Sequence, residues 1–331
     1  MRVGIVGCGF IGEKRAKAAL AAGCQIGMVA DIDRARAEGL AARSGCDRVT
    51  TDWRGVAAAG DVDIVVIAAT HDQLAPIALG AVESGKHVLV EKPAGRNAAE
   101  LAPIIAAAER RQVLVKVGFN HRFHPAMLKA REIFESGALG PMMFVRGRYG
   151  HGGRVGYERE WRFKPEISGG GELIDQGSHL IDLSRWFLGE FTEVFGAVPT
   201  FFWNAPVEDN AFMCLRTAGG QVAWLHAGWT EWKNLFSFEI SGRDGKLQID
   251  GLGGSYGVER LTFYRMTPAM GPPETTSWEY PFPDRSWHDE FAEFVGAIGT
   301  PSDRRRRPLG DIADAIAALD IVGAVYDRGR R

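Results

Sequence analysis

The first 120 residues alternate short aliphatic runs with longer, alanine-rich stretches in which apolar residues recur at helical spacing. Short runs rich in valine and isoleucine are typical of strands covered on both faces, whereas helical spacing indicates amphipathic helices. The expected strands are 3–6, 26–30, 64–69, 88–90 and 114–117, and the expected helices are about 12–22, 33–44, 73–84 and 97–111. This alternation predicts an α/β domain whose doubly wound parallel sheet carries helices on both faces.

After residue 120 the pattern changes. One helix is expected at about 125–136, and another opens after the glycine triplet 169–171 and ends near Gly189. The strands expected next are 210–217, 222–230, 236–241, 246–249 and 260–264, followed by helices at about 286–298 and 310–327. Gly219-Gly220 and Asp244-Gly245 lie between strands, where tight hairpin turns need a positive φ. The pattern predicts an α+β domain with a large, mostly antiparallel open sheet.

The length and charge of the chain narrow its class. A length of 331 residues suggests two domains at about 100 to 200 residues each, which we expect at 1–120 and 121–285. Lys and Arg total 39 against 41 Asp and Glu, so no strong net charge favours nucleic acid or an anionic membrane as a partner. No apolar run approaches the ~18 residues of a membrane span. We therefore expect small-molecule partners.

The cysteines and the first residues suggest where the protein works. The four cysteines show neither a CxxC pair nor the spacing of a metal finger, and a chain of this size needs no disulfides. Met1-Arg2 leads directly into the first apolar run, without the pattern of a secretory signal. We expect reduced thiols and a cytoplasmic protein.

The sequence Gly7-Cys8-Gly9-Phe10-Ile11-Gly12 follows the first expected strand and opens the first expected helix. In such a GxGxxG turn the glycines permit a tight bend, close approach of a pyrophosphate and close helix packing, and the helix N-terminus attracts the phosphates. Asp31 ends the second strand, where a carboxylate accepts from the ribose hydroxyls of NAD and repels the 2′-phosphate of NADP. Together, the GxGxxG turn and Asp31 predict dinucleotide binding, with NAD favoured over NADP. The alternative is that the glycines form only a structural turn.

Two further motifs carry candidate chemistry. Glu91-Lys92-Pro93 follows a strand at the carboxyl edge of the sheet, where doubly wound folds bind ligands, although a solvated charged loop would look the same. Asp175 and His179 are four residues apart on one helix face, close enough for a carboxylate to orient an imidazole, although they could also be a local helix pair. No HExxH motif or Cys/His cluster accompanies them, so we expect no metal.

These motifs occur together with Gly118-Phe119-Asn120-His121-Arg122-Phe123 and with residues 169–179, in the order found in the Gfo/Idh/MocA oxidoreductases. The chain resembles a full-length member of that family over residues 1–327. The resemblance implies a nicotinamide-dependent oxidoreductase acting on a sugar, a polyol or a related carbonyl compound. It also implies that the C-terminal helices, about 286–327, pack back on the nucleotide domain, and that a cis peptide precedes Pro93.

The resemblance assigns candidate residues to roles. The catalytic trio is Lys92, Asp175 and His179. The cofactor would contact Gly7, Gly9, Phe10, Ile11, Gly12, Asp31, Arg34, Thr70, Glu91 and Lys92. Asn120 and Arg122 match positions near the substrate and the nicotinamide. Trp161 is a further candidate at the substrate, because Trp161-Arg162 is a common sequence in the family. The chemistry agrees with these roles, because His179 can accept a hydroxyl proton and the Lys92 ammonium can stabilise an oxyanion.

Arginines are concentrated between residues 146 and 162, at Arg146, Arg148, Arg154, Arg159 and Arg162. Guanidinium groups bind anionic oxygens in a bidentate manner, so Arg154, Arg159 and Arg162 predict a substrate with an acidic group. The alternative is that they pair with Glu158, Glu160 and Glu166 in the same stretch.

The favoured function is therefore hydride transfer between nicotinamide and a sugar derivative, such as a phosphorylated, nucleotide-linked or uronate sugar. Two alternatives remain: a glycosidase that uses NAD for transient oxidation, and a non-catalytic dinucleotide-binding regulator. Aromatic residues on the later strands, among them Trp224 and Phe236, indicate a core or a subunit interface. Together with the resemblance, they lead us to expect a homodimer or homotetramer.

Overall fold

Six parallel strands form the sheet of the N-terminal half. They are β1 (Arg2–Val6), β2 (Gln25–Ala30), β3 (Val49–Thr50), β4 (Ile64–Ile67), β5 (His87–Val90) and β6 (Val115–Val117). Their order is β3-β2-β1-β4-β5-β6, and every pair is parallel. The strand order reverses beside β1, so the doubly wound Rossmann fold expected from the sequence is confirmed.

The computed structural model of the chain describes residues 1–329 apart from 270, 282 and 302–306. The chain divides into two units. The first comprises Met1–Asn120 and Trp287–Ala317, and the second comprises His121–Ser286 and Ala318–Arg331. The division falls within the last helix, α10 (Ile312–Gly329), between Ala317 and Ala318. The reason is that Tyr326 and Arg328 bond to residues of the second unit.

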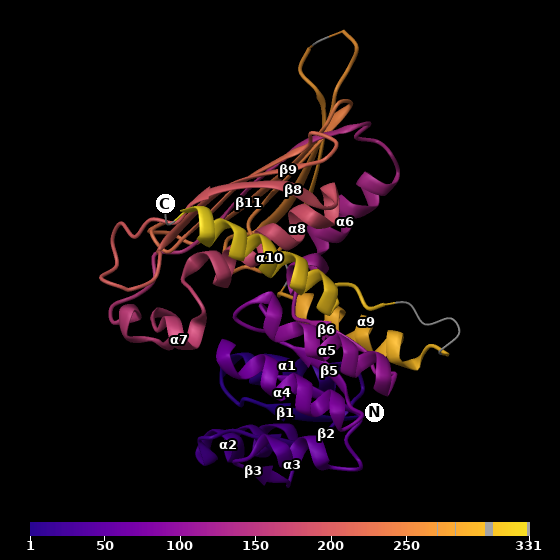
Figure 1. Cartoon of the computed structure of the whole chain (residues 1–331). Helices are drawn as coiled ribbons and strands as arrows, with labels where there is room; N and C mark the ends of the chain where they lie inside the picture. Colours follow the sequence, from indigo (N-terminus) through magenta and orange to yellow (C-terminus); the bar gives the residue numbers. More distant parts are fainter. Residues whose placement is uncertain (270, 282, 302–306, 330–331) are drawn as a thin grey trace. The chain divides into compact units, whose positions relative to one another are not determined.

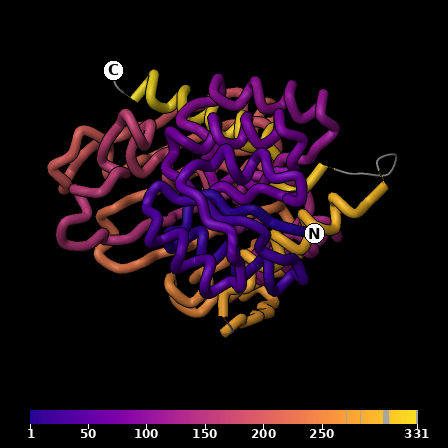
Figure 2. The backbone as a smooth tube through the Cα atoms, turned by 90° about the horizontal axis from the view of Figure 1, so that it is seen from below, coloured from indigo at the N-terminus to yellow at the C-terminus, as the bar shows by residue number. Residues whose placement is uncertain are grey.

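Helices pack against the first sheet. The indigo and violet part of the tube in Figure 2 follows residues 1–120 through these strands and helices. The helices are α1 (Phe10–Ala21), α2 (Arg34–Ser44), α3 (Trp53–Ala58), α4 (His71–Glu83) and α5 (Ala98–Arg111). The sequence did not predict β3 or α3, because elements of two and six residues are too short to show a period. Phe291 and Phe294 of α9 (Ser286–Gly299) are fully buried in the same core as Ile5.

The second unit is built on an eight-stranded sheet with the order β14-β13-β12-β11-β7-β10-β9-β8. The strands are β7 (Met142–Gly150), β8 (Phe191–Ala197), β9 (Asn210–Thr217), β10 (Val222–Gly228), β11 (Leu235–Gly242), β12 (Gly245–Asp250), β13 (Glu259–Arg265) and β14 (Glu274–Tyr280). Only β7 and β10 are paired in parallel. The expected open, mostly antiparallel sheet is confirmed, although β7, β8 and β14 were not predicted.

Helices α6 (Pro125–Glu135) and α8 (Ser178–Leu188) lie along one face of this sheet (Figure 1). The short helix α7 (Pro165–Ser168) precedes a π-helical turn, Leu173–Gly177, that runs directly into α8. Short 3-10 turns occupy Asn120–Phe123, Tyr157–Arg159 and Trp161–Phe163. None of the helices in the described residues has the length and apolar character needed to cross a membrane.

The two predicted hairpin turns differ from each other. Gly220 has a φ of +88° in the turn between β9 and β10, as expected. Gly245 is instead the first residue of β12, and neither it nor Asp244 has a positive φ. Glycine is needed there for space, because a Cβ on Gly245 would approach the Phe263 ring to 2.8 Å.

Candidate active site

The glycine turn after β1 has the shape of a phosphate cradle. Gly7 has a φ of +90°, and a Cβ there would collide with the carbonyl oxygen of Ala68. A Cβ on Gly12 would collide with the carbonyl oxygen of Gly7, whereas a Cβ on Gly9 would meet nothing within 4 Å. No side chain among the described residues caps the N-terminus of α1, so the backbone N–H groups at this helix end can bind an anion. This combination fits a pyrophosphate.

Asp31 is bonded to the same turn. Its Oδ2 accepts from the Cys8 backbone N–H at 2.7 Å, and its Oδ1 accepts from the Asp33 N–H at 2.9 Å. Burial, together with the Asp31 carboxylate, raises the pKa of the Cys8 thiol to about 12, so this cysteine stays protonated. Arg34 is exposed and donates to Glu38 at 2.8 Å, while Phe10 is 73% exposed at the mouth of the turn.

Glu91, which was expected at the cofactor, lies against Arg15 of α1. Arg15 Nε donates to Glu91 Oε1 at 2.5 Å, and Nη1 donates to Glu290 of α9 at 2.5 Å. The Arg15 and Glu290 side chains are fully buried, and burial raises the pKa of Glu290. Gly118 leaves room for this network, because a Cβ there would lie 2.6 Å from Arg15 Nη2.

Lys92 follows Glu91 at the end of β5, and the Lys92–Pro93 peptide bond is cis, as the resemblance implied. Thr70, another expected cofactor residue, lies at the N-cap of α4. Its hydroxyl donates to Asp72 Oδ1 at 2.6 Å. Gly7, Gly9, Gly12, Asp31, Arg34, Thr70, Glu91 and Lys92 all belong to the first unit.

Asp175 and His179 lie on the helical segment that follows the glycine triplet. Asp175 is in the π-helical turn and His179 is in the first turn of α8, and both are less than 10% exposed. The Ser178 hydroxyl donates to the Asp175 backbone carbonyl at 3.1 Å. A π-helical turn leaves backbone carbonyls poorly aligned and is frequent at functional sites, and this hydroxyl satisfies one of them.

Arg162 contacts the Asp175 carboxylate directly. Its Nε donates to Asp175 Oδ2 at 3.0 Å, and its Nη1 lies 3.2 Å from Glu160 Oε2. Burial opposes the charge of Arg162, but its neighbours, Asp175 above all, raise its pKa, so the guanidinium stays protonated. Arg162, expected at the substrate, is therefore bonded to a member of the expected catalytic trio.

Aromatic rings surround His179. The centroid of its ring lies 3.7 Å from that of His121, which in turn lies 5.1 Å from the ring of Tyr149. Burial raises the pKa of Tyr149 well above its ordinary value, so its hydroxyl stays neutral. Gln176 Nε2 donates to the Tyr256 hydroxyl at 3.1 Å. His121 was not predicted to belong to the site, although it lies within the 118–123 motif.

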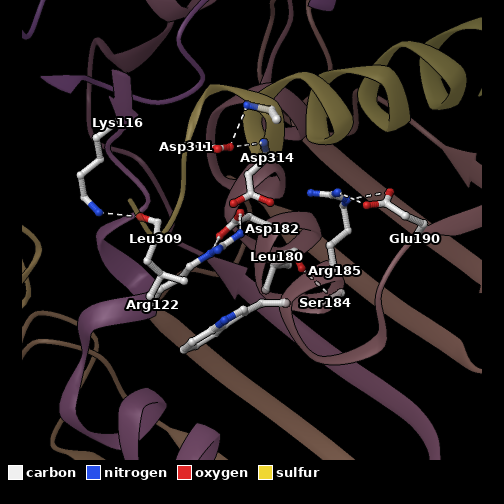
Figure 3. Close-up of polar contacts among 12 residues, drawn as sticks. Lys116, Arg122, Leu180, Asp182, Ser184, Arg185, Glu190, Leu309, Asp311 and Asp314 are labelled. Atoms are coloured by element: carbon white, nitrogen blue, oxygen red, sulfur yellow. Dashed lines mark hydrogen bonds and ion pairs between the residues drawn. The ribbon is translucent and has the colours of Figure 1, made fainter. Parts of the chain in front are cut away.

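Arg122 is engaged in a buried, bidentate ion pair with Asp182 of α8 (Figure 3). The two nitrogen-to-oxygen distances are 2.8 and 2.5 Å, and both side chains are less than 5% exposed. This pair binds the 3-10 turn after β6 to the helix that carries His179. Asn120, in the same 3-10 turn, is 5% exposed.

Three other arginines of the 146–162 stretch, Arg146, Arg154 and Arg159, also have acidic partners. Arg154 pairs with Glu160, and Arg159 lies 3.7 Å from Glu158, with side-chain exposures of 70% and 85%. Trp161 is partly exposed, and its ring lies against the Arg162 guanidinium, 4.7 Å from its centroid. The structure brings Arg162 to Asp175 and leaves Arg154 and Arg159 on exposed positions.

Two family models match the chain. Residues 1–119 match the "Oxidoreductase family, NAD-binding Rossmann fold", and residues 127–248 match the "GFO/IDH/MocA C-terminal domain". Inositol 2-dehydrogenase of Rubrobacter xylanophilus is 31% identical over 260 residues, which is 76% of this chain and 72% of that protein. The chain belongs to the Gfo/Idh/MocA family of oxidoreductases.

Other members of the Gfo/Idh/MocA family are similar along most of the chain. Levoglucosan dehydrogenase of Pseudarthrobacter phenanthrenivorans is 28% identical over 283 residues, covering 75% of this chain and 73% of that protein. A solved structure described as levoglucosan dehydrogenase in complex with NADH and levoglucosan has a TM-score of 0.87 and 25% identity, covering 100% of this chain and 97% of that one. The two domain types of the family are therefore both present here.

Proposed function

We propose that this Gfo/Idh/MocA protein is an NAD-dependent dehydrogenase that oxidises a CH–OH group of a sugar or cyclic polyol, or reduces the corresponding carbonyl. The observation that carries the proposal is the buried Asp175–His179 helix, with Arg162 bonded to Asp175 and His121 packed on His179. The same chain holds the open glycine turn bonded to Asp31, which fits a dinucleotide. A regulator that only binds the dinucleotide would have no need for this buried charged helix.

The residues have distinct parts in this reaction. When bound, NAD supplies the acceptor for the hydride that leaves the substrate carbon. His179 accepts the hydroxyl proton as the hydride departs, and returns it in the reverse direction. Lys92 stabilises the negative charge that develops on the substrate oxygen. Asp175, held by Arg162, keeps the imidazole in place and stabilises its protonated form.

We infer that the substrate is uncharged. Arg154, Arg159 and Arg162 are each paired with a carboxylate, so an acidic substrate would have to displace Glu160, Glu158 or Asp175. The named substrates of two relatives, levoglucosan and inositol, are uncharged compounds. NAD is favoured over NADP because the Asp31 carboxylate would repel a 2′-phosphate and Arg34 is turned to Glu38.

Absorbance at the NADH band tests the proposal. The panel contains levoglucosan, myo-inositol and glucose, with glucuronate and glucose 6-phosphate as matched acidic partners, each assayed with NAD and NADP. We expect turnover of a neutral compound with NAD and weaker turnover of its acidic partner. Preference for the acidic partner would overturn the uncharged substrate. Cleavage of a glycoside without net NADH production would favour the NAD-dependent glycosidase.

We also propose that copies of the chain associate through the face of the eight-stranded sheet on which Trp224 and Phe195 are exposed. Trp224, Cys214 and Phe195 lie in register across β10, β9 and β8, and Trp224 and Phe195 are 58% and 53% exposed. Exposed aromatic residues in one row are typical of an interface. We expect a dimer or tetramer by light scattering and a smaller species for Trp224→Glu, whereas a monomeric wild-type protein at micromolar concentration would contradict the interface.

A further inference from the structure

The carboxylate of Glu208 binds the start of the helical segment that carries Asp175 and His179. Its Oε1 accepts from the backbone N–H groups of Gly171 at 3.0 Å and Leu173 at 3.1 Å. The backbone carbonyl of Glu208 accepts from the Glu172 N–H at 3.1 Å. Three successive backbone N–H groups at the helix start have no partner within the helix. Glu208, which lies 35 positions after Leu173 in the sequence, accepts a hydrogen bond from each of them.

Tyr326 of α10 completes this arrangement. Its hydroxyl donates to Glu208 Oε1 at 2.7 Å, across 118 positions of sequence. Burial raises the pKa of Tyr326 well above its ordinary value, so the hydroxyl remains a donor at every working pH. Glu208 is 7% exposed, and burial raises the pKa of its carboxyl although the hydrogen bonds that the carboxylate accepts oppose the change.

The glycine triplet makes room for these two side chains. A Cβ on Gly170 would collide with the Tyr326 hydroxyl, and a Cβ on Gly171 would collide with the Glu208 carbonyl oxygen. Gly169, with a φ of +80°, ends α7 just before them. Gly170 and Gly171 have ordinary φ values, so their backbone conformation does not require glycine. Glycine is required at both positions because Tyr326 and Glu208 lie too close to the backbone for a Cβ.

We propose that Glu208 and Tyr326 are positioning residues that hold Asp175 and His179 in their reactive geometry; the role in turnover rests on the proposed dehydrogenase function. Asp175 lies two residues after Leu173, whose N–H Glu208 binds, and His179 is one helical turn farther on. A small displacement of a helix start moves every side chain on its first turns. A misplacement of about 1 Å at a reacting centre can cost on the order of a hundredfold in rate.

Three variants separate positioning from general stability. Glu208→Gln keeps an amide oxygen that can accept all three hydrogen bonds, so we expect near wild-type kcat. Glu208→Leu removes the acceptor, and Tyr326→Phe removes one donor. For Tyr326→Phe we expect kcat to fall roughly 10- to 100-fold, as one hydrogen bond to a charged group is lost. The KM for NAD should stay unchanged, because the glycine turn and Asp31 belong to the first unit. Tyr264→Phe on β13 is the matched control.

Amide hydrogen exchange of the 171–179 segment gives a readout that needs no substrate. We expect faster exchange in Tyr326→Phe and Glu208→Leu, and wild-type exchange in Glu208→Gln and Tyr264→Phe. Unchanged exchange in Tyr326→Phe, or faster exchange with kcat within about twofold of wild type, would overturn the positioning role. If Glu208→Leu fails to fold, Tyr326→Phe still decides. Faster exchange in a protein that oxidises no member of the sugar panel would support the contact and overturn only the dehydrogenase function.

Discussion

Arg162 Nε donates a hydrogen bond to Asp175 Oδ2 over 3.0 Å, so an arginine that sequence reasoning placed at the substrate is bonded to a proposed catalytic carboxylate. Charge-assisted contacts of this kind are stronger than neutral hydrogen bonds, and their directionality fixes the orientation of both groups. With Glu160 on its other side, the guanidinium lies between two carboxylates. We therefore propose that Arg162 holds Asp175 and does not attract an acidic substrate.

Replacing Arg162 should therefore reduce the rate without changing the preference for charged or uncharged substrates. We expect Arg162→Met to lower kcat about 10- to 100-fold, the equivalent of one lost hydrogen bond to a charged group, and Arg162→Lys to retain part of the activity. The control is Arg159→Met, whose side chain is 85% exposed and should stay within about twofold of wild type. A larger loss for acidic than for neutral substrates in Arg162→Met would restore the substrate-binding role.

The proposed proton-transfer residues should affect turnover and not cofactor affinity. We expect Lys92→Ala and His179→Ala to lower kcat by about 10² to 10⁴, because each removes a proton acceptor or a charge from the reacting centre. Asp175→Ala should have a smaller effect. Fluorescence titration should show NADH binding close to wild type in all three, and Lys129→Ala on α6 should behave as wild type. Retention of wild-type rates in all three variants would favour the regulator instead.

Cofactor selectivity should depend on Asp31. Asp31→Ser removes the charge that repels a 2′-phosphate, so the ratio of kcat/KM for NAD to that for NADP should fall by on the order of tenfold or more. Asp33→Ser is the matched control, since Asp33 caps α2 and serine caps equally well. Equal use of NAD and NADP by the wild-type enzyme would show that Asp31 does not discriminate.

The Arg15 network should contribute strongly to the stability of the first unit. Arg15→Met leaves the Glu91 and Glu290 carboxylates buried without their cation, which should cost about 3–5 kcal/mol in urea unfolding. Arg15→Met combined with Glu290→Gln should recover part of that loss, because one of the two uncompensated charges is gone. If Arg15→Met lowers the free energy of unfolding by less than about 1 kcal/mol, the ion pairs of Arg15 contribute no more than solvated surface ion pairs do.

The pKa of Glu208 gives stability a pH dependence with a defined sign. Because burial raises the folded-state pKa above the unfolded value of about 4.3, the folded state holds the proton more tightly. Its favourable contribution is complete below that unfolded value and is lost as pH rises through the folded pKa. Glu208→Gln has no such loss, so its Tm relative to wild type should increase between pH 4 and pH 8. A difference that stays constant over this range would contradict the prediction.

Local chemistry explains why much of the fold was predictable from the sequence. The valine- and isoleucine-rich runs of β1, β4 and β5 are buried on both faces, so their composition alone marks them as central strands. The GxGxxG turn and Asp31 are also recognisable, because a tight turn and a strand end require these residues wherever the fold occurs. In contrast, β7 was not predicted, although exposed Arg146 and Arg148 alternate with its buried positions as they do in a half-buried strand.

By itself the sequence determined two domains of known class, the dinucleotide turn and the helix with Asp175 and His179. Only the tertiary structure decided what these residues touch: Asp175 is bonded to Arg162, and the start of its helix is bonded to Glu208, which also accepts a hydrogen bond from Tyr326. The physical reason is range. Strand composition and turn geometry act between near neighbours in sequence, whereas a buried carboxylate takes its partner from whichever segment the fold brings within hydrogen-bond distance, here 118 residues away.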